Sequence, residues 1–353
     1  MPRGRLIRWI ALFASLAVSS TACDDDNPTG PVVPAGVETV VVVNSIDLSI
    51  TVIPADSIEN RQTIGLAQAG SPVSLAARGS YALVPMGFLN SATVVNLATG
   101  DVTALALPDN SGATGVAFLN DSVAYVANPN LNTVSPVNAF AATAGPEIDV
   151  GGFPQGVIAS ADRVFVLNAE LDNTFRPAKA GGVSVIDPST NTVISTVILT
   201  GFNPSAAAFG PDGLLYVINS GTFGQGDGSL SVIDPVTLDE IEHHSGFGEF
   251  PGDIAFGPDG NAYVSSFGYG IAVWDAAADS FIRPPSDPLI VEGHSISSGL
   301  GFDDDGRLYT LIPGDCVAPS SAYRVASGET EAIGVGVCPI DIAFTRVESS
   351  CGC

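Results

Sequence analysis

One sequence segment recurs along this chain at a spacing of 46 or 47 residues. Residues 203–217 (NPSAAAFGPDGLLYV) align without a gap with residues 250–264 (FPGDIAFGPDGNAYV), and a third copy covers residues 300–309 (LGFDDDGRLY). In each copy a short apolar run meets Asp-Gly, and a second apolar run follows. This pattern predicts a hairpin, because Asp and Gly tolerate the positive φ of a tight turn between strands. A regular repeat of this length is typical of a repeat architecture rather than of separate domains.

The second half of the unit repeats as well. Residues 183–194 (VSVIDPSTNTVI) match residues 230–241 (LSVIDPVTLDEI) at an offset of 47, and weaker copies cover residues 92–102 and 271–275. Each unit therefore holds four short strands, which we name A to D in chain order. A proline precedes strand A in five units: Pro72, Pro154, Pro204, Pro251 and Pro339.

The proline spacing gives the number of units. Its intervals of 82, 50, 47 and 88 residues correspond to six units between Pro72 and Pro339, because two of the intervals hold two units each. A seventh unit is split, with strand A at residues 340–344 and strand B at residues 39–44. The sequence predicts an all-β fold for residues 37–348, a seven-bladed β-propeller of four-stranded antiparallel blades. The C-terminal strand is expected to join the N-terminal blade and close the ring.

Composition excludes two classes of protein. The chain carries 37 acidic and 12 basic side chains, a formal net charge of −25, and Lys179 is its one lysine. A nucleic-acid-binding protein needs many Lys and Arg side chains to neutralise phosphates, so no nucleic-acid partner is expected. A disordered acidic chain is excluded too, because 46% of the residues are hydrophobic.

The N-terminus predicts export and a lipid anchor. Three arginines precede an apolar run at residues 9–18, and small residues then lead to Cys23, so residues 1–22 have the pattern of a signal peptide. The junction resembles a bacterial lipoprotein lipobox, which implies a lipid on Cys23, although Ser20 stands where Leu is usual. Ordinary cleavage after Ala22 is the alternative. Residues 23–36 are predicted to be an acidic, proline-containing tether to the bacterial membrane, in the periplasm or on the cell surface.

Strand B carries a recognisable run, at residues 125–128 (YVAN) and 216–219 (YVIN) and, degenerately, at 165–168 and 263–266. Together with the Ser-Val-Ile-Asp of strand C and the Pro-Asp-Gly turns, it resembles the YVTN-type β-propeller repeats. These occur in surface-layer and secreted bacterial proteins, lactonases and quinoprotein-like chains, so the resemblance implies a fold rather than a chemistry. Its Tyr and Val are expected to pack between blades, and its Asn to cap a turn or reach a ligand.

In such a ring the B–C and D–A loops share the face around the channel mouth. Two residues after the proline, strand A carries Asp253 and Asp341, with Ser74, Gly156 and Ala206 at the equivalent positions. Two carboxylates facing one channel could hold Ca²⁺ or another divalent cation through oxygen ligands, as in lactonase-like propellers. Solvated acids or water ligands are the alternative reading. No other cofactor is expected.

Two long B–C loops, residues 169–182 and 220–228, lie on the same predicted face. The side chains in these loops that could contact a partner are Phe175, Arg176, Lys179 and Phe223. His294 precedes the last blade on that face, whereas His243 and His244 are expected at a surface strand end and form no zinc motif. The binding-face candidates are Asn128, Asn168, Phe175, Asn219, Phe223 and His294.

Four further cysteines suggest disulfides in an exported chain. Cys316 and Cys338 fall in loops on the same face of the last blade, which predicts a bond between them. The tail at residues 349–353 holds Cys351 and Cys353. These two cysteines could bind a metal, form a local disulfide or link to another molecule, and the sequence does not choose among the three.

These features favour a monomeric, non-catalytic binding or scaffold protein that presents loops to a protein or glycan partner and meets the membrane through its lipid alone. The alternative is a metal-dependent, lactonase-like hydrolase that uses the channel carboxylates. A quinone-dependent dehydrogenase is less consistent with the sequence, because no cationic cluster is present to hold a tricarboxylate cofactor.

Overall fold

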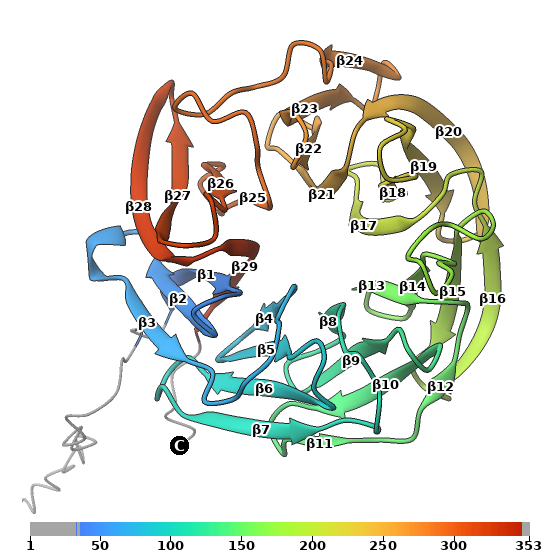
Figure 1. Ribbon diagram of the computed structural model, residues 1–353, viewed down its shortest axis with the longest axis horizontal. Coiled ribbons are helices and arrows are strands. Elements are labelled where there is room, and N and C mark those ends of the chain that lie inside the picture. The colour runs from blue at the N-terminus through green and yellow to red at the C-terminus, as the bar shows by residue number, and fades with distance from the viewer. Residues whose placement is uncertain (1–32, 34–35, 348–353) are drawn as a thin grey trace, which may run out of the picture. The chain divides into compact units, whose positions relative to one another are not determined.

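The computed structural model describes residue 33 and residues 36–347, which form seven antiparallel sheets arranged as blades around a central channel (Figure 1). The predicted seven-bladed propeller is confirmed. Blade 1 combines the last strand with the first three, and blades 2 to 7 follow in chain order. The described residues contain one helix, the short 3-10 helix η1 (Ile58–Asn60).

Each blade contributes one strand to the channel wall and one to the rim. The innermost strands, from blade 1 to blade 7, are β29 (Pro339–Arg346), β4 (Ala76–Arg78), β8 (Val116–Phe118), β13 (Pro154–Ala159), β17 (Pro204–Phe209), β21 (Pro251–Phe256) and β25 (Leu300–Phe302). The outermost strands are β3 (Gln62–Gly65), β7 (Val102–Ala106), the pair β11 (Thr143–Ala144) and β12 (Ile148–Asp149), β16 (Thr192–Ile198), β20 (Asp239–Gly248), β24 (Ser280–Arg283) and β28 (Glu329–Val337).

The two middle strands of each blade are the most buried. The second strands are β1 (Glu38–Asn44), β5 (Tyr81–Pro85), β9 (Val123–Asn128), β14 (Val164–Asn168), β18 (Leu215–Asn219), β22 (Ala262–Ser266) and β26 (Leu308–Ile312). The third strands are β2 (Ser49–Pro54), β6 (Ser91–Asn96), β10 (Thr133–Asn138), β15 (Gly182–Asp187), β19 (Gly228–Asp234), β23 (Gly270–Asp275) and β27 (Pro319–Ala326). Their valines and isoleucines fill both faces of each sheet, because neighbouring blades cover both sides.

Aromatic side chains pack from blade to blade at a repeated position. The second-strand ring of one blade meets the first-strand phenylalanine of the next blade edge to face, with ring centroids 4.9–5.8 Å apart. These pairs are Phe165–Phe209, Tyr216–Phe256, Tyr263–Phe302 and Tyr309–Phe344. The aromatic residue of the YVTN-like run therefore packs between blades, as the sequence predicts.

The C-terminal strand closes the ring. β29 pairs antiparallel with β1 from Glu38↔Arg346 to Asn44↔Pro339, so the two ends of the propeller share one sheet. This pairing confirms the predicted closure, and it removes the free edges that an open ring would leave.

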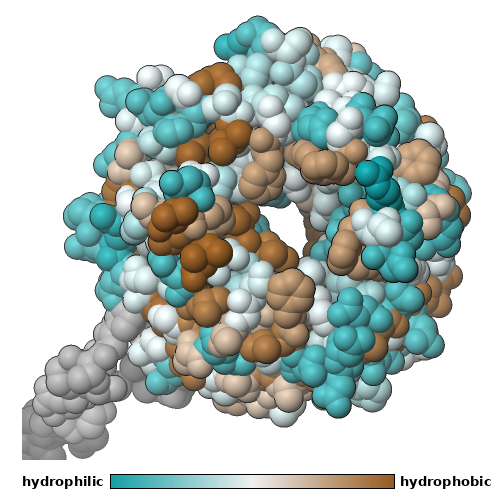
Figure 2. All heavy atoms as spheres, in the orientation of Figure 1, coloured by the Kyte–Doolittle hydropathy of each residue, from teal (hydrophilic) through white to brown (hydrophobic). Residues whose placement is uncertain are grey.

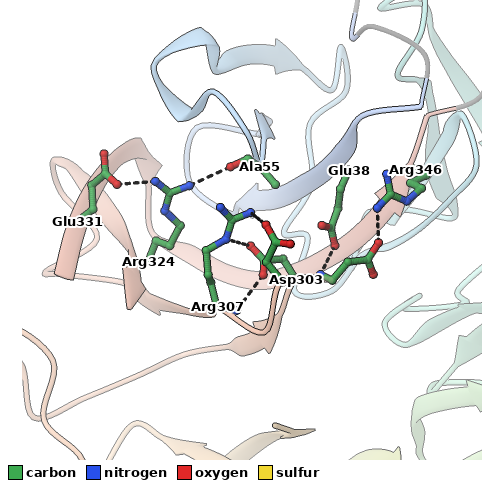
Figure 3. A network of polar contacts seen from close by, with 9 residues as sticks. Glu38, Ala55, Asp303, Arg307, Arg324, Glu331 and Arg346 are labelled. Carbon is green, nitrogen blue, oxygen red and sulfur yellow. Dashed lines mark hydrogen bonds and ion pairs between the residues drawn. The ribbon is translucent and has the colours of Figure 1, made fainter. Parts of the chain in front are cut away.

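Arginines gather where blade 7 meets blade 1 (Figure 3). Arg324 on β27 donates to the backbone oxygen of Ala55 at 2.8 Å and to Glu331 at 2.6 Å. The Glu38 carboxylate on β1 accepts the backbone N–H of Asp304 from blade 7 at 2.7 Å. Arg61, beyond η1, donates to the backbone oxygen of Gly334 on β28 at 2.7 Å. We call this boundary between blades 7 and 1 the seam. Charged hydrogen bonds are roughly twice as strong as neutral ones, so these contacts hold the two blades firmly together.

Candidate functional site

The B–C and D–A loops lie at one end of the channel. In blade 5, the start of the first strand pairs with the end of the second (Pro204↔Asn219), and the start of the third pairs with the end of the fourth (Gly228↔Gly248). The loops before the first strand and after the second therefore emerge together, and the repeat places them so in every blade. We call this end the loop face.

A cavity of about 510 Å³ occupies the channel, whose opening at the centre of the ring is visible in Figure 2. Its wall includes the five positions that lie two residues after the proline, or their equivalents: Ser74, Gly156, Ala206, Asp253 and Asp341. The remaining lining is made of backbone, hydroxyls, the Gln155 amide and apolar side chains, which include Leu167 and Phe267. No Lys, Arg or His of the described residues lines it.

Each channel aspartate accepts two backbone N–H groups. Asp253 accepts from its neighbour Ile254 at 2.8 Å and from Leu300 of blade 7 at 3.1 Å. Asp341 accepts from Ile342 at 2.8 Å and from Leu75 of blade 2 at 2.8 Å. Both carboxylates therefore connect one blade to the next.

These two contacts belong to a complete circuit, in which every blade is joined to its neighbour beside the channel. Five joints use neutral groups and two use carboxylates. In order from blade 1, the joints are Leu75 N to Asp341, Ser74 Oγ to Thr114 O, Thr114 Oγ1 to Gln155 O, Gln155 Nε2 to Pro204 O, Ser220 Oγ to Pro251 O, Leu300 N to Asp253 and Ser298 Oγ to Pro339 O.

The two carboxylates are hard to ionise together. Burial raises the pKa of Asp253 to about 6, and the backbone hydrogen bonds offset only part of this. Burial, followed by the charge on Asp253, raises the pKa of Asp341 to about 8. At neutral pH the pair therefore retains much of one proton, and a bound cation would have to displace it. The described lining of the cavity offers the pair no asparagine as a third ligand.

The strand-end asparagines lie inside the blades. Asn128, Asn168 and Asn219 are fully buried, and each Nδ2 donates to a hydroxyl on the third strand of its own blade. Asn219, for example, donates to Ser229 at 3.2 Å and Ser231 at 2.8 Å. This geometry braces the start of the B–C loop, and it leaves no exposed amide for a ligand.

The two loop phenylalanines are exposed and supported. Phe175 is 69% exposed and packs edge to face on Phe153, with ring centroids 5.8 Å apart. Phe223 is 67% exposed and packs against Phe250 at 4.9 Å. In both cases the supporting ring directly precedes the proline of a D–A loop and has positive φ. Nearby, Lys179 forms a 3.2 Å ion pair with Glu170.

Sequence reasoning missed several further apolar groups on this face. Exposed side chains from other B–C and D–A loops include Phe88, Phe202, Phe267 and Val317. The signal available in the sequence was a large apolar residue inside a Gly-rich loop that adjoins a strand end, as in Met-Gly-Phe-Leu at residues 86–89 and Ser-Phe-Gly-Tyr at residues 266–269.

His294 and the cysteines occupy defined positions. His294 lies 3.1 Å from the Tyr323 hydroxyl, away from the residues that line the cavity. Cys316 and Cys338 form a disulfide that joins the B–C loop of blade 7 to the loop entering β29. Cys23, Cys351 and Cys353 lie outside the described residues. Within residues 36–347 we find no helix long and apolar enough to cross a membrane.

No protein-family model and no curated protein matched the chain. Among solved structures, a chain of Kuenenia stuttgartiensis hydrazine synthase is similar, with a TM-score of 0.58 and 18% sequence identity over 72% of this chain and 76% of that chain. Similarity at this level of identity shows the fold alone.

Proposed function

We propose that this chain is a YVTN-type propeller, lipid-anchored through Cys23 outside the bacterial cytoplasm, that binds a protein partner through its loop face without catalysis. A ring closed by hydrogen bonds and filled with apolar side chains is a rigid support for loops. Binding is also a role consistent with the propeller fold.

The distribution of exposed hydrophobic side chains carries the proposal. Within residues 36–347, sixteen large hydrophobic side chains are exposed, and ten belong to loops of one face. Scattered single residues are ordinary on a protein surface, whereas a bias of exposed apolar side chains toward the loops of one face supports an interaction site there. The ten are Ile46, Val73, Phe88, Leu89, Phe175, Phe202, Phe223, Phe267, Ile290 and Val317.

A protein partner fits these side chains better than a glycan does. The aromatic residues exposed on these loops are phenylalanines, which supply apolar contact area and no hydrogen-bonding group. A sugar presents hydroxyls and needs polar partners beside a stacking ring. The chain is also strongly acidic overall, with a net charge of −25, so a partner with basic residues around an apolar patch would associate fastest.

The single lysine makes a direct test possible. Lys179 lies in the B–C loop of blade 4, four residues after Phe175, and it is the only lysine of the chain. An amine-reactive crosslinker added to cells that display the protein should therefore join a bound partner to the propeller through the loop face. The Lys179→Arg chain should lose this product, which separates it from any adduct formed through the N-terminal α-amino group.

Matched variants decide whether the apolar loops carry binding. Phe175→Ser with Phe223→Ser should abolish the crosslinked product, whereas Phe140→Ser with Val236→Ser, on exposed turns at the other end of the blades, should leave it unchanged. A product that survives the first pair contradicts the proposal. Glycan binding that the first pair abolishes, without any protein product, would instead identify a glycan partner. Cys23→Ala should release the chain from the membrane fraction.

The hydrolase alternative is tested at the channel. It needs a cation on Asp253 and Asp341, whose oxygens already accept four backbone N–H groups. Metal analysis of the purified chain and its melting temperature with and without Ca²⁺ measure this directly. Bound metal and a calcium-dependent shift that Asp253→Asn abolishes would favour the hydrolase over the binding protein.

A further inference from the structure

A second cluster of ligand-type side chains lies at the outer rim, between blades 5 and 6 and away from the channel. Glu242 and His244 belong to β20 of blade 5, and Asp279 belongs to the turn between β23 and β24 of blade 6. His244 Nε2 lies 3.1 Å from a Glu242 carboxylate oxygen and 3.8 Å from an Asp279 oxygen. One ligand atom from each of the three side chains lies within 4.8 Å of the other two.

The strand and its neighbours fix this arrangement. Residues two apart on a strand point to the same side, so Glu242 and His244 face blade 6 together. The His244 ring packs on the buried Trp274 indole, with centroids 4.8 Å apart, and Trp274 packs in turn against Phe247 and Phe281. The imidazole is therefore held in place by an aromatic wall rather than left free to rotate.

The cluster also has excess negative charge. Within residues 36–347, neither Glu242 nor Asp279 forms an ion pair with Lys or Arg, and His244 is the only partner of each. The same two carboxylates act on Tyr216, whose pKa is raised chiefly by burial and by the hydrogen bond to Asp212, with smaller contributions from both charges. Asp212 is a third carboxylate beside Tyr216, and within the described residues none of the three forms an ion pair with Lys or Arg.

We propose that Glu242, His244 and Asp279 bind one divalent transition-metal ion, with Zn²⁺ the best match, and that this ion links blades 5 and 6. Tetrahedral Zn²⁺ with bonds near 2.1 Å places its ligand atoms about 3.4 Å apart, so the observed separations need only small side-chain movements. The imidazole favours Zn²⁺ over Ca²⁺, which takes oxygen ligands. Water completes the coordination on the exposed side.

Histidine spacing along the chain did not indicate this site. The sequence contains no zinc motif, and His243 and His244 were expected at a surface strand end. The third ligand comes from a different blade, 35 residues further along the chain, and only the stacking of blades brings it close.

Trp274 gives a direct measurement, because Co²⁺ bound at His244 would quench the indole that the imidazole touches. The chain has two tryptophans, Trp9 and Trp274, and a Cys-x-Cys tail that could bind metal by itself. The parent for the experiment is therefore the full chain with Trp9→Phe, Cys351→Ser and Cys353→Ser, purified without a histidine tag and treated with a chelator. We expect saturable Co²⁺ quenching at one ion per chain, reversed by Zn²⁺ and not by Ca²⁺.

Variants distinguish a metal site from an unoccupied polar cluster. His244→Asn and Glu242→Gln should each lower the affinity for Zn²⁺, measured by its competition with Co²⁺, by at least about 10–100-fold. His294 lies on the loop face, so His294→Asn should leave this affinity unchanged. Zn²⁺ should also raise the melting temperature of the parent and of His294→Asn, but not of His244→Asn. Equal melting temperatures in chelator would show that the variants fold alike. Quenching that is absent, or that His244→Asn does not alter, overturns the proposal.

Discussion

Gly201, in the loop that carries the chain from blade 4 to blade 5, has no room for a side chain. A Cβ atom at this position would overlap the Asn219 side-chain amide and lie 2.8 Å from Ser229 Oγ. Real Cβ atoms essentially never come within 3.0 Å of such a neighbour, so Gly201→Ala must displace the Asn219 amide. That amide is buried and donates to the hydroxyls of Ser229 and Ser231, and any displacement breaks these bonds.

The loss of free energy follows from those contacts. A buried hydrogen-bonding group left without a partner costs about 1–3 kcal/mol, and forcing a methyl group into a packed site costs a similar amount. Because the amide can recover part of its bonding after moving, we expect Gly201→Ala to lower the free energy of unfolding by about 3 kcal/mol. Gly65→Ala on β3 is the matched control, since a Cβ there meets nothing within 4 Å.

Denaturant unfolding of the two variants and the native chain measures the effect. A double-mutant cycle identifies its cause: if Asn219 is the obstacle, Gly201→Ala should add little to the loss already produced by Asn219→Ala. A surface substitution usually changes the free energy of unfolding by no more than about 0.5 kcal/mol. The reasoning is refuted if the free energies of unfolding of Gly201→Ala and Gly65→Ala differ by less than about this amount. It is refuted as well if the effects of Gly201→Ala and Asn219→Ala are additive.

Three further outcomes follow from the structure. Replacing Cys316 and Cys338 together with Ser should lower the free energy of unfolding by about 3 kcal/mol, because the bond spans a separation of 22 residues; an unchanged denaturation midpoint would contradict this. Arg324→Ala should cost about 2 kcal/mol by leaving the Ala55 carbonyl without its charged donor, whereas Arg283→Ala, an exposed ion pair with Asp287, should change the midpoint little. In the folded chain the Asp253–Asp341 pair still holds a proton at a pH at which the unfolded aspartates have released theirs, so raising the pH lowers the free energy of unfolding. Between pH 5 and pH 9 this loss should be about 1–3 kcal/mol larger for the native chain than for the Asp341→Asn chain. Parallel melting temperatures of these two chains across that range would show that the pair does not titrate as described.

The fold could be predicted because its information is local and repeated. In each unit, an apolar run, a turn and a second apolar run predict the first two strands. The unit that is split between the two ends of the chain predicts closure of the ring. The outer strand of blade 3 was harder to foresee, since it is broken into β11 and β12. Pro146 lies between them, and it has no N–H to donate to a neighbouring strand.

The candidate sites depended on information that no local pattern contains. The register after the proline placed Asp253 and Asp341 at the channel, because strand direction and strand start fix that position. The partners of those carboxylates could not be foreseen, since the Leu75 N–H that Asp341 accepts lies 266 residues away in the sequence. The Asn side chains differ, because their hydroxyl partners lie on the next strand of the same blade and the pairing of the two strands brings them together.

The seam between blades 7 and 1 takes several of the chain's few basic residues. Strands β1, β2 and β3 enter the ring from the N-terminal side, so no continuous chain links them to blade 7, and hydrogen bonds must hold them there. Beside the channel, the same two blades are joined by a neutral hydrogen bond from Ser298 Oγ to the backbone oxygen of Pro339. At the seam, Arg61 and Arg324 bridge from one blade to the other through backbone oxygens, while Glu38 accepts from blade 7. Other basic residues pair with acidic groups around the ring, among them Lys179 with Glu170 and Arg283 with Asp287. Within residues 36–347 no Lys or Arg pairs with Glu242 or Asp279, so the rim cluster of Glu242, His244 and Asp279 keeps the negative charge that can attract a metal ion.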